Sequence, residues 1–234
     1  AVPPETLQQL ELSGNGTIVT AFASNVERLL LNQTNPDPAL GDNRSVWLPN
    51  GANKHPFLTE PFVHRALSLA IDRRQIAALY GDAGQPTCNL LPGPPAYAST
   101  ANNDCLNQDI EFANALLDER GFIDEDGDGI REANGIPMTI VFQTSTNAIR
   151  QQSQELIAAW WAAIGVKAEL RNVDAATFFG NQADPNSYTN FYADVQMYTN
   201  GTLEADPQTY LETWLTTEIN GSGSNAVGRN IPRW

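Results

Sequence analysis

The sequence is poor in positive charge, and its few basic residues are scattered. Its 234 residues include 13 Lys and Arg against 27 Asp and Glu, so the formal net charge at pH 7 is −14. Arg73 and Arg74 are the one adjacent basic pair. Nucleic acids and anionic membranes attract proteins through clustered Lys and Arg. We therefore expect no nucleic-acid partner and no electrostatic attachment to a membrane surface.

Long apolar runs are also missing, because no stretch approaches the roughly 20 apolar residues of a membrane span. The N-terminus, Ala1-Val2-Pro3-Pro4, has neither the basic nor the apolar region of an export signal. We expect any such signal to be removed or to lie outside these residues. Hydrophobic residues make up 41% of the chain, enough for a sizeable core, and charged residues only 17%. The surface is therefore mostly uncharged and polar, which suits contacts with peptides, sugars or other small solutes.

Catalytic motifs are scarce. The sequence contains no G-x-S-x-G elbow, no H-E-x-x-H zinc motif, no Walker loop and no G-x-G-x-x-G loop. Its two histidines are His55, in a loop before Pro56, and His64, on a predicted helix. A single helical histidine is more often packed or at the surface than catalytic. The residues by themselves give little support to the hypothesis that the protein is an enzyme.

Two cysteines, Cys88 and Cys105, flank a proline-rich loop. No histidine or second cysteine pair lies near them to suggest zinc, so a disulfide is the better interpretation. The alternative is two unrelated buried thiols in a cytosolic protein. A disulfide that closes a loop of this length stabilises by about 3 kcal/mol and persists only in an oxidising compartment.

Alternating strand and helix patterns with short connections predict an α/β fold. The clearest unit covers residues 138–171, where an apolar run, a long helix ended by Gly165 and an alternating run follow one another. Such a βαβ unit is expected to be right-handed, with parallel strands. Thr59, Asp72 and Asp109 are the expected caps of three further helices. We expect helices over 4–12, 59–70, 72–80, 109–120, 149–163 and 207–215, strands over 17–22, 138–143, 166–171 and 191–198, and an apolar run over 26–31.

An acidic turn over residues 124–132 reads DEDGDGIRE. Oxygen ligands at positions one, three and five with Gly at six are how an EF-type calcium loop begins, which would make Asp124, Asp126 and Asp128 the ligands. The twelfth position should be a bidentate Glu but is Gly135, and Glu132 could substitute only in an irregular geometry. The other interpretation is a solvated turn into the next strand. We expect no other metal or cofactor.

Two loops at predicted strand ends carry the candidate binding residues. In open α/β sheets ligands bind outside the carboxyl ends of the strands, and free N–H groups at a helix start attract carboxylates or phosphates. The loop 144–147 joins a strand to the long helix, although ordinary capping explains its residues equally well. The segment 198–204 follows the end of another predicted strand. The residues expected to face a ligand are Gln143, Ser145, Asn147, Tyr198, Asn200 and Glu204.

Three stretches of the chain occur in an order typical of one protein family. Residues 56–73 read PFLTEPFVHRALSLAIDR, residues 121–129 read GFIDEDGDG, and residues 160–170 read WWAAIGVKAEL. They look like the signature "PF.d..vRqAl..AiDr", the turn "Gf.D.dGDG" and the helix-strand step "lk.iGv.vel". In this order they resemble the peptide/nickel-type (family 5) extracellular solute-binding proteins of ABC importers, through most of the chain.

The resemblance implies one lobe of a type II (cluster C) periplasmic-binding-protein fold, with a mixed sheet flanked by helices. It implies a non-catalytic substrate-binding component of an ABC transporter, which captures an oligopeptide or similar solute and delivers it to the membrane permease subunits. Full members are roughly twice this length, above the usual domain size. Residues 1–32 would then leave the first lobe and cross between lobes, 33–219 would form the second lobe, and 220–234 would be a truncated tail. The whole protein would be a periplasmic or extracellular monomer, anchored as a lipoprotein.

One departure from the family concerns the ligand. Peptide-binding members carry a Trp and an acid shortly before the proline that opens the helix at 207, and the acid meets the amino group of the peptide. Here Tyr198 and Asn200 stand near the Trp position, Leu203 falls at the position of the acid, and Glu204 is adjacent. A sugar or another neutral solute is therefore an alternative to a peptide.

A hypothesis from another class is a secreted hydrolase domain. Carboxylates such as Glu204 and Asp206 would act as acid and base, since two carboxyl groups can suffice for glycoside hydrolysis. No motif ties a second acid to them. A calcium-stabilised adhesion module is a third hypothesis and rests on the acidic turn alone.

Overall fold

Four strands form the central sheet of the protein: β1 (Val26–Leu31), β4 (Thr139–Ser145), β5 (Lys167–Val173) and β6 (Val195–Asn200). The computed structural model describes residues 4–19, 22, 24–48, 50–180, 183–202, 204–219 and 228–234. The strand order is β1-β6-β4-β5, with β4 parallel to both of its neighbours and β1 antiparallel to β6. A small hairpin, β2 (Glu132–Ala133) and β3 (Ile136–Pro137), precedes β4. The predicted α/β class with a mixed sheet is confirmed.

Strands β4 and β5, with α5 (Ala148–Ala162) between them, form the predicted βαβ unit. Helix α5 begins at Asn147, whose Oδ1 accepts hydrogen bonds from the backbone N–H groups two and three residues later (3.0 and 3.2 Å). After the helix, Gly165 takes a left-handed φ of 72°, a conformation that glycine adopts without a Cβ penalty. Local sequence therefore places both ends of this helix.

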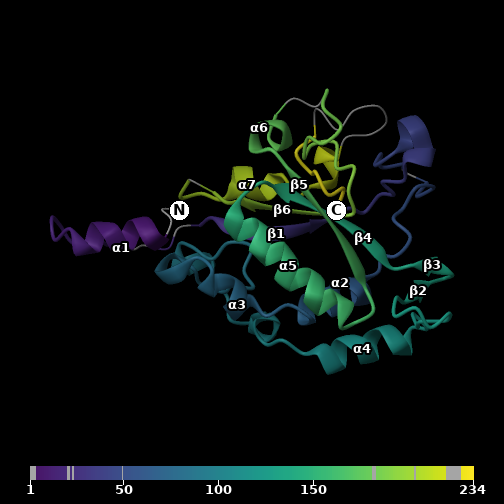
Figure 1. Ribbon diagram of the computed structural model, residues 1–234. Helices are drawn as coiled ribbons and strands as arrows, with labels where there is room; N and C mark the ends of the chain where they lie inside the picture. Colours follow the sequence, from purple (N-terminus) through teal and green to yellow (C-terminus); the bar gives the residue numbers. More distant parts are fainter. Residues whose placement is uncertain are drawn as a thin grey trace.

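Helices α2 (Pro61–Leu69), α4 (Ile110–Glu119) and α5 cover one face of the sheet, with α3 (Arg73–Ala78) beside them (Figure 1). Trp161 of α5 is fully buried, with its ring centroid 5.5 Å from that of Phe142 in β4. Its Nε1 donates to the carbonyl oxygen of Leu67 in α2 (3.1 Å). One side chain thus joins α5 to the sheet and to α2.

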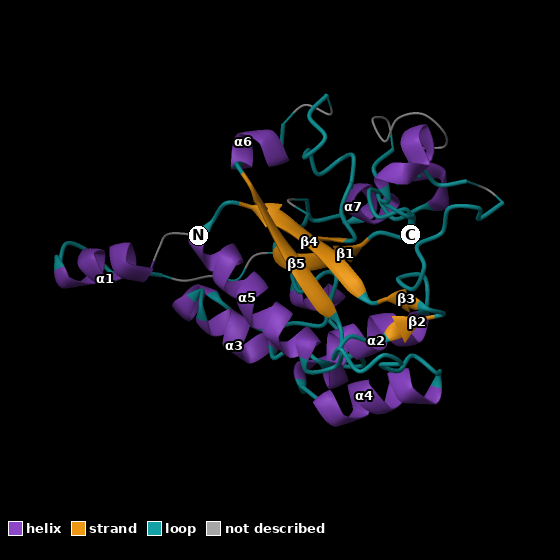
Figure 2. Ribbon diagram, turned by 45° about the vertical axis from the view of Figure 1, so that its right-hand side comes forward, coloured by secondary structure: helices purple, strands orange, loops and turns teal. Residues whose placement is uncertain are grey.

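The short helices α6 (Ala175–Phe178) and α7 (Gln208–Glu212) lie on the other side of the sheet (Figure 2). They accompany a second buried cluster, which is smaller and more aromatic than the first. Its members are Leu30, Val173, Phe178, Phe191, Ala193 and Tyr198.

Two of the three predicted helix caps are confirmed. Asp109 caps α4, and Asp72 caps α3 by accepting from the backbone N–H groups two and three residues later (2.9 and 3.1 Å). The prediction for Thr59 is wrong, because Glu60 occupies the N-cap of α2 and makes no side-chain cap. The first helical residue is Pro61, which has no N–H group to satisfy, so a cap at this helix start has less to contribute.

Some predicted element bounds differ from the structure. The strand expected over 191–198 begins at Val195, because Phe191 has a left-handed φ of 54° that a strand does not continue. The helix expected over 207–215 ends at Glu212. Of the strand expected over 17–22, residues 17–19 and 22 are not in a strand, and residues 20 and 21 lie outside the described residues. Short 3-10 turns occupy Pro38–Asn43, Gly81–Ala83, Pro95–Tyr97, Asn103–Leu106 and Thr216–Glu218.

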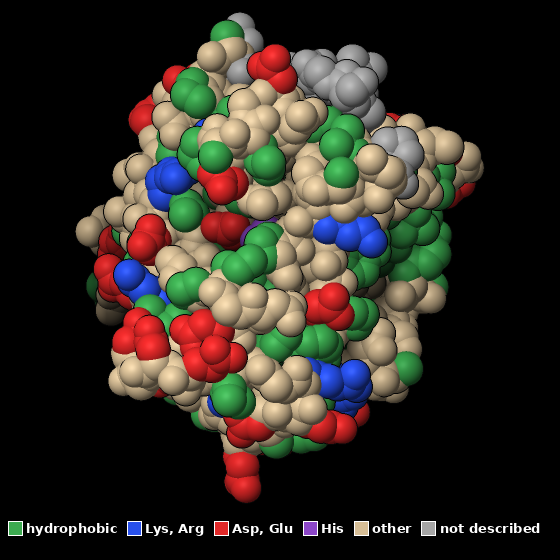
Figure 3. Space-filling view, turned by 90° about the vertical axis from the view of Figure 1, so that its right-hand side faces the viewer, with side chains coloured by type: hydrophobic (Ala, Val, Ile, Leu, Met, Phe, Trp, Pro, Cys, Tyr) green, Lys and Arg blue, Asp and Glu red, His purple; other side chains and the backbone are tan. Residues whose placement is uncertain are grey.

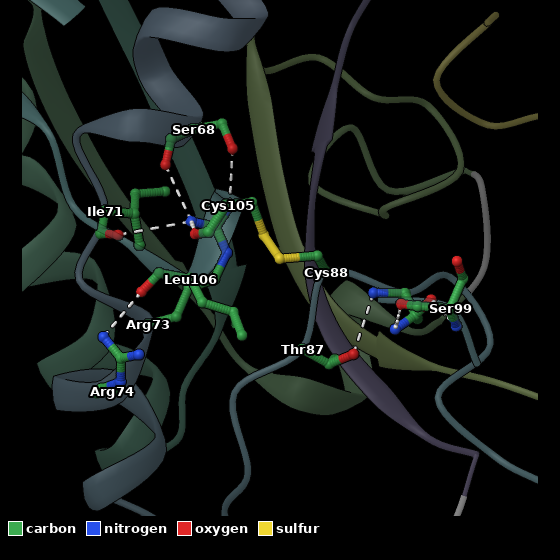
Figure 4. The surroundings of a disulfide bond; sticks show 10 residues. Ser68, Ile71, Arg73, Arg74, Thr87, Cys88, Ser99, Cys105 and Leu106 are labelled. Atoms are coloured by element: carbon green, nitrogen blue, oxygen red, sulfur yellow. Dashed lines mark hydrogen bonds between the residues drawn. A yellow bond between two sulfur atoms is a disulfide. The ribbon is translucent and has the colours of Figure 1, made fainter. Parts of the chain in front are cut away.

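Cys88 and Cys105 form a disulfide across a sequence separation of 17 residues (Figure 4). Arg73 Nη1 donates to the carbonyl oxygen of Cys105 (2.7 Å) and to a carbonyl oxygen in the last turn of α2 (2.9 Å). Arg74 Nη1 donates to the carbonyl oxygen of Leu106 (3.1 Å). Burial lowers the pKa of Arg73. The single adjacent basic pair of the sequence therefore ties the disulfide loop to the helices.

Helix α1 (Pro4–Leu12) extends away from the rest of the molecule in both ribbon views (Figures 1 and 2). Leu10 is 53% exposed and Leu12 is 81% exposed. Within the described ranges, no helix is both long enough and apolar enough to span a membrane. On the face shown in Figure 3, basic side chains form only small separate groups, as their scatter in the sequence predicts.

Candidate ligand-binding site

The carboxyl ends of β4, β5 and β6 meet at one edge of the sheet, because these three strands are parallel. The amino end of β1 lies at the same edge, since Val26 pairs with Asn200 in the antiparallel ladder. We call this the carboxyl edge. Both predicted loops, 144–147 and 198–204, follow strands that end here, which is where open α/β sheets bind ligands.

Three of the six predicted ligand residues are buried. Gln143 is 1% exposed and donates from Nε2 to the carbonyl oxygen of Asn186 (2.7 Å). Ser145 is 2% exposed, and its Oγ accepts from Arg150 Nη1 (2.6 Å). Tyr198 is 6% exposed, and burial raises its pKa. These three side chains are therefore packed within the fold at the ends of β4 and β6.

The other three predicted residues are exposed at the edge. The Oδ1 atom of Asn147 caps α5, and the Oδ1 atom of Asn200 accepts from the next backbone N–H (2.8 Å). The carbonyl oxygen of Asn200 also accepts from Arg28 Nη2 (2.7 Å). The Glu204 backbone is held by a hydrogen bond from its N–H to a threonine hydroxyl (3.1 Å), and its carboxylate faces solvent. Leu203, which stands at the position of the family's acid, lies outside the described residues.

An ion pair beneath the carboxyl edge joins β1 to α5. Arg150 donates from Nε and Nη2 to the two carboxylate oxygens of Glu27 (2.9 and 3.2 Å), and their side chains are only 14% and 16% exposed. Thr199 also donates to Glu27, and the Tyr80 hydroxyl lies 3.5 Å from the same carboxylate. Burial raises the pKa of Tyr80, and the negative charge of Glu27 adds to that rise. Together with the bond to Ser145, the network fixes β1, β4, β6 and α5 at one point.

Sequence reasoning missed both Glu27 and Arg150. Glu27 had a detectable signal, because it and Arg28 are charged residues in the run VERLLL, whose other four residues are apolar. Arg150 had none, since a basic residue in the first turn of a helix is usually solvated. Their sequence separation is 123 residues, so only the fold reveals the pair.

A cavity of about 500 Å³ opens at the carboxyl edge beside β1 and β6. Two hydrogen bonds join segments around this cavity: the hydroxyl of Ser24 donates to the carbonyl oxygen of Thr202, and the Tyr97 hydroxyl donates to the carbonyl oxygen of Ala205 (2.9 Å). Among the described residues of the lining, Glu204 carries the single charge. The lining comprises Phe22, Ser24, Gln85, the run 92–95, Thr202, Glu204 and Ala205.

His55 has a structural environment away from this edge. Its Nδ1 accepts from the backbone N–H groups of Phe57 and Leu58 (3.2 and 2.9 Å), so Nε2 carries the hydrogen and donates to Asp194 Oδ1 (2.9 Å). The other oxygen of Asp194 accepts from the backbone N–H of Val141 (2.7 Å). The pair therefore attaches a loop to the sheet before β6 begins.

The acidic turn uses its carboxylates on its own backbone. The carboxylate oxygens of Asp124, Asp126 and Asp128 lie within 4.8 Å of one another, and all three residues are exposed. Asp124 accepts from the backbone N–H groups three and five residues later (2.7 and 2.9 Å), and Asp126 and Asp128 each accept from the N–H two residues later (3.1 and 2.7 Å). Buried Glu132, expected as a substitute ligand, accepts from the backbone N–H of Glu125 (2.8 Å). Backbone amides thus account for the shape of the turn without a cation.

Comparison with solved structures finds the same fold within several longer proteins. The oligopeptide-binding protein AppA of Bacillus subtilis, in complex with a nonapeptide, superposes with a TM-score of 0.65 at 20% identity over 97% of this chain and 40% of its own. The mannohexaose-bound oligopeptide ABC transporter periplasmic protein of Thermotoga maritima gives 0.61 at 21% identity over 90% of this chain and 36% of its own. NikA of Brucella suis, in complex with Fe(III)-EDTA, gives 0.59 at 20% identity over 91% and 38%. At these identities the likeness shows the fold.

The chain spans about two fifths of the length of the solved proteins it matches. No curated protein sequence gives a significant match. A family profile described as the middle part of the bacterial extracellular solute-binding proteins, family 5, matches residues 1–222. That match covers nearly the whole sequence and confirms the resemblance carried by its three motifs. The chain belongs to the bacterial extracellular solute-binding proteins, family 5.

Proposed function

We propose that this chain is part of the substrate-binding component of an ABC importer and holds its solute at the carboxyl edge. The observation that carries the proposal is the family match over residues 1–222. The open cavity beside Glu204 and the exposed Asn147 and Asn200 supply hydrogen-bonding groups at that edge. Open α/β sheets use this position for ligands.

The whole protein would enclose its solute between two lobes, of which residues 33–219 form the second. Residues 1–32 would come from the first lobe and the crossing between lobes, and 220–234 would lead toward the remainder. The detached position of α1 supports this division, although β1 already pairs within the sheet of the second lobe. The complete receptor would work outside the cytoplasmic membrane as a lipid-anchored monomer and deliver its solute to the permease subunits.

The solute would be an oligopeptide or a similarly elongated molecule. Two of the structural neighbours are described with a nonapeptide and with mannohexaose, both of them long and flexible. An edge shared by four strands suits such ligands, because neighbouring strand ends are about 4.8 Å apart and span about 14 Å in all. No cofactor is needed for capture and release.

The proposed role is non-catalytic. The hydrolase hypothesis needs Glu204 and Asp206 as a working pair, yet Asp206 accepts a hydrogen bond from the backbone N–H of Gln208 (2.9 Å) at the start of α7. That contact gives Asp206 a structural use. In a glycosidase the two carboxyl groups instead lie on either side of the scissile bond, and the surroundings of one of them raise its pKa so that it can act as the acid.

The test is a titration of the isotope-labelled chain, followed by NMR, with mixed oligopeptides and mixed oligosaccharides at millimolar concentration. We expect shifts at the amides of Asn147, Asn200 and Glu204, and none in the acidic turn. Affinity should be no tighter than about 0.1 mM, because a single lobe provides only half of the walls that normally enclose a ligand.

Glu204→Gln should alter the titration, whereas Glu125→Gln, an exposed acid in the acidic turn, serves as the matched control and should not. Shifts confined to regions away from the carboxyl edge would contradict the proposal. Micromolar affinity would show that the site is complete within these residues. Hydrolysis of any ligand during the titration would favour the enzyme hypothesis.

A further inference from the structure

A second cavity opens at the opposite edge of the sheet. Its volume of about 470 Å³ is within the usual range for small-molecule sites. Gln33 and Thr34 in its wall directly follow β1, whose last residue, Leu31, pairs with the first residue of β6. The carboxyl edge lies at the other end of these strands, roughly 20 Å away by the rise of the six residues of β1. The cavity is therefore separate from the proposed solute site.

Backbone hydrogen bonds hold the walls of this cavity together. The segments 33–35 and 53–55 pair through two such bonds, of 2.8 and 3.1 Å. The N–H of Gln33 also donates to the carbonyl oxygen of Pro232 (3.0 Å), which attaches the segment 228–234 to the same wall. Segments far apart in the sequence thus form a cavity that exists before any ligand binds, and a preformed site loses little free energy to ordering.

Two cationic side chains, Arg233 and Lys54, line the cavity. Arg233 is 3% exposed, and its Nη1 and Nη2 donate to backbone carbonyl oxygens while its Nε is buried without a hydrogen-bond partner. Burial lowers the pKa of Arg233 to about 9, so the guanidinium is still charged at neutral pH. Lys54 is exposed, and its Cε lies only 2.8 Å from the position that a Cβ on Gly51 would take. The ion pairs between described residues include neither cation.

The composition of the lining favours a negatively charged ligand. Among the described residues of this lining there is no acid, although Asp and Glu outnumber Lys and Arg by 27 to 13 in the whole sequence. A guanidinium that is buried without a counter-ion destabilises the fold. An anion bound in the cavity would offset that cost, and the exposed ammonium group of Lys54 would add to the attraction.

Aromatic side chains complete the lining. Trp47 and Trp234 both belong to it, and the ring of Trp234 lies 5.2 Å from that of His64, with the two planes tilted by 34°. Indole rings offer flat apolar surfaces to a flat ligand. We propose that this cavity is a second binding site, for a small organic anion that carries a carboxylate on a flat apolar body, with Arg233 and Lys54 supplying the positive charge.

The sequence has two lysines, Lys54 and Lys167, which give the test a matched pair. Lys167 lies at the start of β5, has a side chain that is 53% exposed, and pairs with Glu169. Reductive methylation of the full chain with isotope-labelled formaldehyde gives each lysine an NMR signal and keeps its charge. We expect cinnamate at millimolar concentration to shift the Lys54 signal and to leave the Lys167 signal in place. Cinnamamide, which has the same shape without the charge, should bind about tenfold more weakly.

Calorimetry on unmethylated variants completes the test. Lys54→Met should weaken cinnamate about five- to tenfold, whereas Lys167→Met should leave its affinity unchanged. Arg233→Met should weaken it further, and the Lys54 variant decides the matter if the Arg233 variant does not fold. Equal shifts at both lysines, or equal affinity for cinnamate and cinnamamide, would overturn the anion site. Inorganic phosphate binding as tightly as cinnamate would overturn the organic ligand. Cinnamate shifts at the amides of Asn147 and Asn200 alone would move the anion to the carboxyl edge and overturn the second site. None of these failures would contradict the proposed function.

Discussion

Replacing Arg150 with methionine should destabilise the protein substantially. The substitution keeps a long apolar stem but leaves Glu27, with a side chain only 16% exposed, without its cation. Breaking a buried ion pair by removing one partner costs about 3–5 kcal/mol. The residual exposure of both groups and the remaining bond from Thr199 reduce the expected loss to about 2–3 kcal/mol.

Urea unfolding followed by circular dichroism is the assay. With a slope of about 2–3 kcal/mol per molar urea, the loss corresponds to a midpoint lower by about 1 M. The control is Lys167→Met, which removes an ion pair to Glu169 whose side chains are 53% and 55% exposed. That control should cost less than about 0.5 kcal/mol.

The double variant Glu27→Met/Arg150→Met separates charge burial from packing. Removing both charges leaves no unpaired ion, so the double variant should recover about 2 kcal/mol relative to the sum of the single variants. An Arg150→Met loss no larger than that of Lys167→Met would refute the reasoning. It would mean that the ion pair is solvated and does not hold β1 to α5.

Three further predictions concern features outside the ligand edge. Thiol titration of denatured, unreduced protein should find no free thiol, and reduction of the Cys88–Cys105 bond should cost about 3 kcal/mol, in keeping with a 17-residue separation; two free thiols would contradict this. Burial would raise the pKa of Asp72, but the hydrogen bonds from Gln75 and Arg74 outweigh it and lower that pKa below 3.8. The cap contribution is therefore complete above pH 4 and lost as the pH falls through the lowered value, so Asp72→Ala should cost about 1 kcal/mol at pH 7 and progressively less below pH 4 in urea unfolding. Millimolar calcium should not raise the melting temperature, because the acidic turn lacks a bidentate twelfth ligand; a rise of several degrees that a chelator reverses would show tight binding.

The sequence by itself determined the features that short-range physics controls. The βαβ unit over 138–171 follows from periodicity, from the Asn147 cap and from Gly165, and the structure shows all three. The caps at Asp72 and Asp109 follow from side-chain oxygens within reach of nearby N–H groups. The family motifs also lie within single segments.

Pairings between distant segments were decided only by the tertiary structure. Nothing near Tyr198 in the sequence shows that α6 and the segment after it will cover its ring, so its burial could not be predicted. Phe191 belongs to an alternating pattern typical of a strand. In the structure its side chain packs in the second buried cluster and its backbone has a left-handed φ, so β6 begins only at Val195. Glu27 and Arg150 meet because the sheet places β1 beside β6 and the crossover places α5 above them. The sequence predicted the proposed ligand edge, because strand ends are local features. Which residues support that edge depends on how segments pack against one another, as Glu27 and Arg150 do across 123 positions.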